Sequence, residues 1–192
     1  SSDVCSSDLN NQELAHIFKS WNEGELYSYL IGITAGIFRE ADDLGDGELI
    51  DRIKDSAKQK GTGRWASIEA LKQGVDISMI TSACTARIMS NHLDEREKAW
   101  QLIHSPAVGL SPDKESFAAM VREALYTGKI IAYAQGFSLM QDASRLYGWN
   151  LDLGKIASIF RAGCIIQAVF LNDITHAFEA EPKDRKSTRL NS

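Results

Sequence analysis

The chain has 192 residues, of which 44% are hydrophobic and 24% charged, with only 3 prolines and 14 glycines. This length and composition suit one globular domain and exclude a collagen-like or disordered chain. There are 26 acidic and 21 basic residues, a net charge of -5. Nucleic acid is therefore not expected as a partner, because binding to a phosphate backbone needs clustered basic side chains.

Membrane insertion and secretion are not expected either. No apolar run approaches the ~20 residues that cross a bilayer, and the N-terminus, SSDVC, lacks the basic and apolar regions of a signal peptide. The three cysteines, Cys5, Cys84 and Cys164, are odd in number and widely spaced. They predict neither a disulfide framework nor a metal site, and they favour a reducing, cytoplasmic compartment.

The two ends differ in composition from the rest of the chain. Residues 1–9 and 183–192 are polar and show no apolar period. Such segments cannot bury enough apolar surface to offset their ordering entropy, so we expect disordered and non-native tails. Residues 10–182 are then the folded domain. Because the chain has no initiator methionine, we expect it to be a fragment of a longer protein.

Apolar residues recur every three or four positions through the first half, which indicates helices. In chain order the predicted helices cover about 14–21, 26–37, 49–53, 65–73, 77–88 and 94–103. Asp42–Gly47 resembles half of a calcium loop but lacks its acidic ligands, so a solvated turn is expected. Gly74 is expected to end one helix and Asp76 to cap the next, whose buried stripe includes Ile88.

The second half continues in the same way. Ser111 and Pro112 predict the start of a long helix that reaches about Arg145. Asn150 is expected to cap a helix around 156–160, and a last helix carries the apolar residues from Ile165 to Ile174. No segment alternates with the period of two that marks a strand. The prediction is an all-α fold of eight or nine helices.

Sequence motifs for common chemistry are absent or incomplete. Gly61–Ala66 fits G-x-G-x-x-A, but a helix precedes it and no acidic residue stands about 20 positions later, so it predicts no nucleotide site. The histidines show no metal-ligand spacing; they are His16, His92, His104 and His176. No serine lies in a G-x-S-x-G motif.

The segment Lys60–Arg64 (KGTGR) is the best candidate binding site. It leads into a helix N-terminus, where free N–H groups and the positive dipole end favour an anion. The helix from Trp65 to Gln73 climbs about 13 Å, and ten residues of an antiparallel return helix bring Arg87 back about 15 Å. Lys60, Thr62 and Arg87 then converge as a phosphate clamp. Equally open is a solvated turn, with Arg87 paired to a surface carboxylate.

Five segments resemble the 6-phosphogluconate dehydrogenase family, in the right order across residues 10–181. They are Phe18–Leu30 (FKSWNEGELYSYL), Lys60–Trp65 (KGTGRW), Ala86-Arg87, Lys129–Phe137 (KIIAYAQGF) and Ile159–Ile166 (IFRAGCII). No single segment identifies the family, but five segments in the right order are highly specific for it. The chain departs from the family pattern in two small ways: Arg64 stands where Lys is usual, and Gln167 where Arg often follows.

The resemblance implies an NADP-dependent homodimer with an N-terminal Rossmann domain and a large helical domain, of which this chain is the first part. It also implies that Lys60, Thr62 and Arg87 hold the phosphate of 6-phosphogluconate, with Gly61 and Gly63 supporting the loop. The family oxidises and decarboxylates this substrate to ribulose 5-phosphate in the oxidative pentose phosphate pathway.

The same resemblance implies that the proton-transferring Lys and Glu and the NADP-binding domain lie upstream of this chain, and that a segment completing the partner subunit's site lies downstream. No catalytic residue is then expected here, and the fragment itself should be inactive. Its expected roles are substrate anchoring and dimer scaffold. A non-catalytic helical interaction module remains the alternative, and hydroxyisobutyrate-type relatives are closer rivals that are not expected to share K-G-T-G-x-W.

Overall fold

The computed structural model describes residues 9–103 and 113–180, which form nine helices and no strand beyond two isolated bridges. The helices are α1 (Asn11–Trp21), α2 (Tyr29–Ile37), α3 (Leu49–Arg52), α4 (Thr62–Gln73), α5 (Ser78–Ser90), α6 (Leu93–Leu102), α7 (Lys114–Tyr147), α8 (Leu153–Ile159) and α9 (Leu171–Ala180). The predicted all-α class is confirmed. Apart from Leu9, both predicted tails lie outside the described residues, so their non-native origin stays a prediction.

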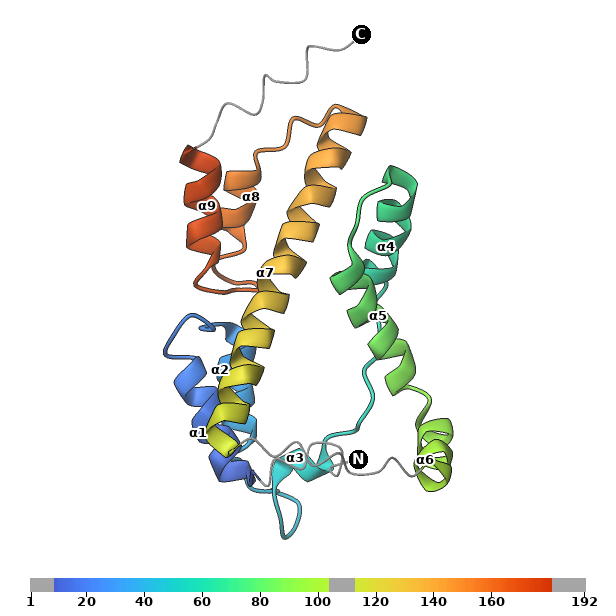
Figure 1. The fold of residues 1–192 in the computed structure, drawn as a ribbon, viewed down its shortest axis with the longest axis vertical. Coiled ribbons are helices and arrows are strands. Elements are labelled where there is room, and N and C mark those ends of the chain that lie inside the picture. Colours follow the sequence, from blue (N-terminus) through green and yellow to red (C-terminus); the bar gives the residue numbers. More distant parts are fainter. Residues whose placement is uncertain (1–8, 104–112, 181–192) are drawn as a thin grey trace.

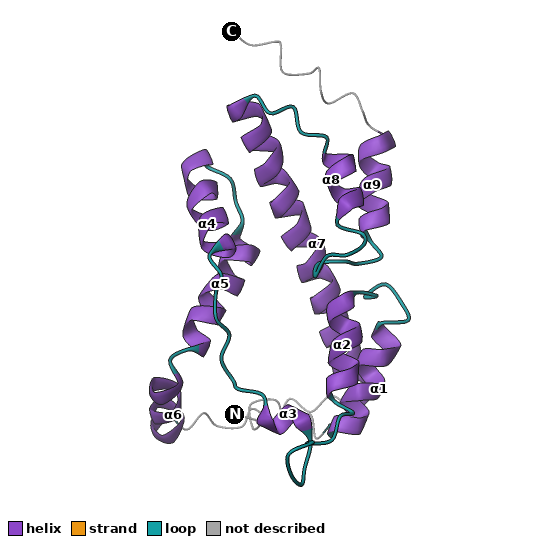
Figure 2. Cartoon of the chain, turned by 180° about the vertical axis from the view of Figure 1, so that it is seen from behind, coloured by secondary structure: helices purple, strands orange, loops and turns teal. Residues whose placement is uncertain are grey.

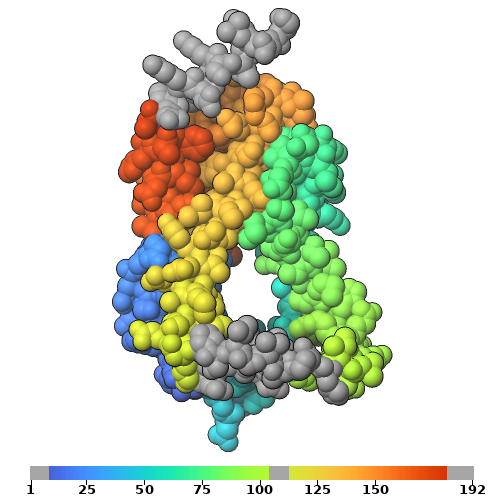
Figure 3. Space-filling view, viewed as in Figure 1, coloured from blue at the N-terminus to red at the C-terminus, as the bar shows by residue number. Residues whose placement is uncertain are grey.

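Helix α7 is the central element of the structure. Its 34 residues extend about 51 Å at 1.5 Å per residue. The pairs α1–α2 and α8–α9 lie along one side of it, and α4 and α5 lie on the other side (Figure 1). The space-filling view shows that α5 touches the later half of α7, while an opening separates α5 and α6 from its first half (Figure 3).

The apolar core lies where α7, α8 and α9 meet. Two clusters of buried residues form it: Phe137, Leu153 and Ala157 in one, and Ala168, Phe170 and Leu171 in the other. Tyr133 of α7 packs against both clusters, and its ring meets that of Phe170 edge to face with centroids 4.7 Å apart. Burial, followed by the nearby Cys164, raises the pKa of Tyr133 to about 12.

The first two helices join this core through a short backbone bridge. Tyr29 N–H donates to the Gln167 carbonyl at 3.2 Å, and Val169 N–H donates to the Tyr27 carbonyl at 3.1 Å. Leu26, just before this bridge, is only 1% exposed. The segment preceding α9 is therefore a bridge and turn, so the predicted start of the last helix near Ile165 is wrong; α9 begins at Leu171.

Two other helix starts and one buried position differ from the prediction. Asp113 caps α7 by accepting from Ser116 N–H; the expected Ser111 and Pro112 lie outside the described residues. Asp152 caps α8, whereas Asn150 takes a positive φ of 51° in the preceding turn. Asp76 does accept from Ser78 N–H at 2.8 Å, but Ile88 at the far end of α5 is 52% exposed rather than buried.

A buried glutamine fastens α5 to α7. The Oε1 atom of Gln135 accepts from Met79 N–H at 3.0 Å, and its Nε2 donates to Asp76 Oδ2 at 3.1 Å and Ser78 Oγ at 3.0 Å. Gln135 is 9% exposed. Since a buried amide must find partners, these three bonds fix the position of the start of α5 against the central helix.

Candidate functional site

The N-terminus of α4 begins three residues earlier than the sequence pattern predicted. Gly61 is its N-cap with φ of 104°, and no side chain caps the helix. Thr62, Gly63 and Arg64 therefore form the first turn, and Trp65 N–H is the first to bond within the helix, to the Gly61 carbonyl at 2.9 Å. The three earlier N–H groups are those that a helix start leaves available to an anion.

Gly61 is required here for two reasons. Its positive φ is one that residues with a Cβ rarely adopt. The Trp65 ring also covers it closely, since a Cβ at position 61 would lie 3.3 Å from Trp65 Cζ2. The glycine thus permits the sharp entry by which the chain turns from Lys60 into the helix.

Helices α4 and α5 pack antiparallel, as the hairpin arithmetic predicted. Gly74 ends α4 with φ of 71°, and Ser67 Oγ lies 3.1 Å from Thr81 Oγ1 across the pair. One turn nearer the start of α4, Gly63 faces Cys84 so closely that a Cβ on Gly63 would be 2.3 Å from the sulfur. This register extends the last turn of α5 past the first residue of α4.

Arg87 lies in that last turn, beside the chain that leads into α4. Its Nη1 donates to the Lys58 carbonyl at 3.5 Å. The structure therefore brings Arg87 next to the segment that ends at Lys60. The side chains of Lys60, Thr62 and Arg87 are all exposed, and Gly61 and Gly63 are partly buried.

The cations of the candidate site have no carboxylate partners among the described residues. Ion pairs involve eight other basic side chains there, and none involves Lys60, Arg64 or Arg87. The alternative in which Arg87 pairs with a surface carboxylate thus finds no such pair within residues 9–103 and 113–180. Unpaired positive charge beside a helix N-terminus is suited to a multiply charged anion.

The opposite side of the hairpin is tied to the end of α7. The Tyr147 hydroxyl donates to Glu69 Oε1. This bond lowers the pKa of the Glu69 carboxyl and raises that of the Tyr147 phenol. The bond anchors α4 on the side away from the candidate site, so it leaves the cations at the other end exposed.

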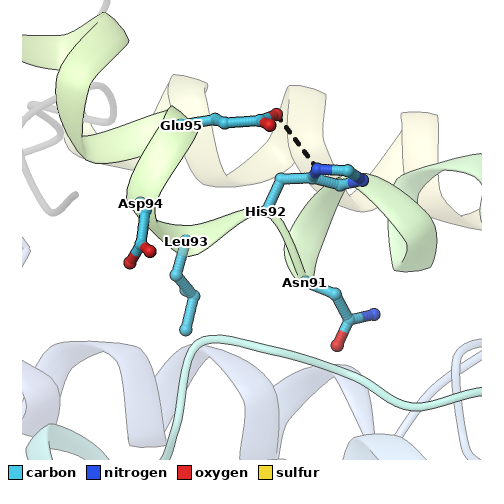
Figure 4. A pocket seen from close by; sticks show the side chains of 5 residues that line it. All are labelled: Asn91, His92, Leu93, Asp94 and Glu95. Atoms are coloured by element: carbon cyan, nitrogen blue, oxygen red, sulfur yellow. Dashed lines mark ion pairs between the residues drawn. The ribbon is translucent and has the colours of Figure 1, made fainter.

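Two surface hollows are lined by residues other than the candidate ones. One of about 330 Å³ at the α5–α6 turn is lined by Asn91–Glu95, where His92 Nδ1 and Glu95 Oε2 are 3.0 Å apart (Figure 4). The other, about 820 Å³, lies between α1 and the start of α7. Neither is lined by Lys60, Thr62 or Arg87, whose side chains are exposed.

The described residues carry neither a metal-ligand cluster nor a membrane span. No three of their His, Cys, Asp or Glu side chains gather as metal ligands. None of the described helices is long and apolar enough to cross a membrane.

The predicted Asp42–Gly47 turn is present: Asp42 accepts from Leu44 N–H at 3.0 Å and pairs with Arg52 at 2.6 Å.

Sequence reasoning missed the residues that join the two segments of the candidate site. Gln59, Ser90 and Asn91 connect the loop before α4 to the end of α5 through their side chains. Their signal is weak, because polar residues at a helix end and in a loop are ordinary, and only the tertiary register makes them neighbours.

Comparison with known proteins agrees with this architecture. Residues 4–190 match the family model described as 6-phosphogluconate dehydrogenase, C-terminal domain. The chain is 48% identical over 173 residues to the decarboxylating 6-phosphogluconate dehydrogenase of Lactococcus lactis strain IL1403, covering 90% of this chain and 37% of that protein. It is 49% identical over 175 residues to that of Escherichia coli K12, covering 91% and 37%.

A solved structure gives the same result. The Plasmodium falciparum 6-phosphogluconate dehydrogenase, described in its apo form and in complexes with NADP+ and with 6-phosphogluconate, matches with a TM-score of 0.85 and 41% identity. The match covers 92% of this chain and 38% of that one, so the chain spans less than two fifths of these relatives. The family model, the relatives and the solved structure agree, so the chain belongs to the 6-phosphogluconate dehydrogenase family and represents part of its C-terminal helical domain.

Proposed function

We propose that this chain is the part of a decarboxylating 6-phosphogluconate dehydrogenase that binds the substrate's phosphate through Lys60, Thr62 and Arg87. The observation that carries the proposal is the position of Arg87, whose guanidinium lies against the Lys58 carbonyl beside the uncapped N-terminus of α4. Two full positive charges, a hydroxyl and free N–H groups together suit a phosphate dianion.

The complete enzyme would oxidise 6-phosphogluconate with NADP, and the resulting 3-keto acid would lose CO2 to give ribulose 5-phosphate. We infer from the family resemblance that the general base, the general acid and the NADP-binding domain belong to other parts of the enzyme. The role of this segment is to fix the substrate's remote phosphate, so that binding energy positions the reacting carbons.

We propose that the segment also serves as scaffold for a cytoplasmic homodimer. Large apolar side chains stand exposed along several described helices, including Leu71 at 84%, Leu102 at 81% and Ile159 at 69%. Exposed apolar surface of this kind favours burial against further protein. An interaction module would show it too, but the family membership favours the remaining parts of the same enzyme. The free thiols of Cys84 and Cys164 suit a reducing compartment.

The test measures steady-state kinetics of the complete enzyme with Arg87→Ala and Lys60→Ala. A hydrogen bond to a charged group contributes about 1.5–3 kcal/mol, so each change should raise the substrate's KM about 10- to 150-fold. The KM for NADP should barely change. The two changes together should be less than additive, because both cations serve one dianion.

Lys58→Ala is the matched control. Lys58 is an exposed lysine two residues before Lys60, and its removal reduces the local charge equally while its backbone carbonyl, which Arg87 uses, remains. The substrate's KM should stay within about threefold of wild type, as for a surface charge. An unchanged KM in Arg87→Ala would contradict the proposal. The 192-residue chain alone should produce no NADPH from 6-phosphogluconate above a blank.

A further inference from the structure

The segment that delivers Lys60 to the clamp is attached to α5 along its length. We call residues Ala57–Gln59 the strap; it runs beside the end of α5 before the chain enters α4 (Figures 1 and 2). Ala57 N–H donates to Ser90 Oγ at 2.9 Å, and Asn91 Nδ2 donates to the Ala57 carbonyl at 3.0 Å. Gln59 Nε2 donates to the Cys84 carbonyl at 2.9 Å.

The same side chains hold the backbone of Arg87. A helix leaves its last carbonyls without helical partners, and the Arg87 carbonyl is one of these. It accepts from Ser90 Oγ at 2.8 Å and from Asn91 Nδ2 at 2.7 Å. Ser90 Oγ therefore donates to the Arg87 carbonyl and accepts from the strap. The amide group of Asn91 donates to the Arg87 carbonyl and to the strap.

These hydrogen bonds oppose the electrostatic repulsion between the two cations of the clamp. Lys60 and Arg87 are both positively charged, and without a bound anion like charges repel. Neither has a carboxylate partner among the described residues that would hold it in place. The strap's backbone bonds are neutral, so they can fix the two cations near each other without cancelling the charge that attracts the phosphate.

We propose that Asn91, assisted by Ser90 and Gln59, is a positioning residue of the phosphate clamp: it joins the carbonyl of Arg87 to the strap and so sets the separation of Arg87 and Lys60. The proposal rests on the proposed function, because it assumes that the two cations share one phosphate. Asn91 itself does not touch the phosphate, and its effect passes through the backbone of its neighbours.

The test compares variants of the complete enzyme. Asn91→Leu keeps the side chain's shape and removes its donors, and Gln59→Ala loosens the strap at its other end. Thr81→Val is the matched control, because it removes the bond to Ser67 in the same hairpin and leaves the strap intact. Each variant is assayed for turnover, for substrate and coenzyme affinity through their KM values, for inhibition by inorganic phosphate, and for melting temperature.

Asn91→Leu and Gln59→Ala should each raise the substrate's KM, and the inhibition constant of phosphate, about 3- to 10-fold, the range of a neutral hydrogen bond. Turnover and the KM for NADP should stay within about twofold. Thr81→Val should lower the melting temperature about as much as Asn91→Leu and Gln59→Ala do, but it should leave the substrate's KM unchanged. In an Arg87→Ala background, Asn91→Leu should add less than about twofold, because its effect passes through Arg87.

The outcomes separate the two proposals. If Arg87→Ala leaves KM unchanged, the proposed function fails. If Arg87→Ala raises KM while Asn91→Leu and Gln59→Ala behave like Thr81→Val, the clamp stands and the positioning role is refuted. Fully additive effects of Asn91→Leu and Arg87→Ala would refute it as well.

Discussion

The contact between Gly63 and Cys84 provides a sharp test of the hairpin register. A Cβ at position 63 would lie 2.3 Å from Cys84 Sγ and 4.0 Å from Cys84 Cβ. Optimal contacts between heavy atoms are about 3.5–4.0 Å, so the sulfur alone causes the clash. In Gly63→Ala either the sulfur must leave its position or the two helices must separate by more than about 1 Å at this level.

The expected magnitude follows from two opposing effects. Overpacking costs about 1–3 kcal/mol, and we take the middle, about 2 kcal/mol, because the contact is very short but the contacting atom is the end of a side chain. Alanine in place of a helical glycine gains up to about 1 kcal/mol. Gly63→Ala should therefore destabilise the chain by about 1 kcal/mol, which lowers Tm by about 2–4 °C at this size.

The decisive comparison uses Cys84→Ala as the background. Without the sulfur the new methyl group meets nothing closer than an ordinary contact, so only the helix propensity remains. Gly63→Ala should then raise Tm rather than lower it. Thermal melting of the four proteins, followed by circular dichroism at 222 nm, measures this reversal. If Gly63→Ala shifts Tm equally in both backgrounds, the packing derived from the structure is incorrect.

Three further changes test other contacts. Gln135→Leu leaves the Met79 N–H without its buried acceptor, which should cost about 1–3 kcal/mol and lower Tm by about 2–12 °C. Burial lowers the pKa of Lys129, and its Nζ has no hydrogen-bond partner in the described residues. Lys129→Met should therefore raise Tm at pH 7, with a gain that shrinks as pH rises toward about 10. The hydrogen bond from Lys114 lowers the pKa of Glu13. Lys114→Met should accordingly lower Tm at neutral pH, and the difference from wild type should vanish as pH falls through about 4 and below.

The sequence predicted those parts of the fold that depend on local pattern. Leu14, Ile17, Phe18 and Trp21 lie on one face of α1, and Gly74 takes the left-handed conformation at the end of α4. Caps were harder to assign, because several residues near a helix start can accept its N–H groups. Asp152 caps α8 where Asn150 was expected, although both are suitable by type.

The errors elsewhere have tertiary causes. Two glycines near Thr62 favoured a loop by propensity, yet Gly63 lies within the helix. Position 63 is a glycine because close packing on Cys84 leaves no room for a side chain. The strap was not predictable, since Ala57 and Asn91 are 34 residues apart and no periodicity connects them. The roles of Lys60, Thr62 and Arg87 came from the family resemblance; the spacing supported only their proximity.

One part of the hairpin is anchored to the central helix and another part carries the proposed clamp, and we expect this division to determine what each substitution can change. Gln135 holds residues 76–79 against the central helix, whereas Arg87 lies nine residues beyond Ser78, about 13 Å further along α5. At that distance we expect the strap, not the core, to position the cations. A change at Gln135 removes part-buried bonds that join α5 to the central helix, so it should act mainly on melting temperature. A change at Asn91 removes bonds that are exposed and local, so it should act mainly on substrate affinity. Because Gln135 holds the start of α5 and Asn91 holds its end, opposite ratios of these effects would show that the place along α5 where a bond is lost, rather than loss of hydrogen bonding as such, determines the effect on substrate affinity.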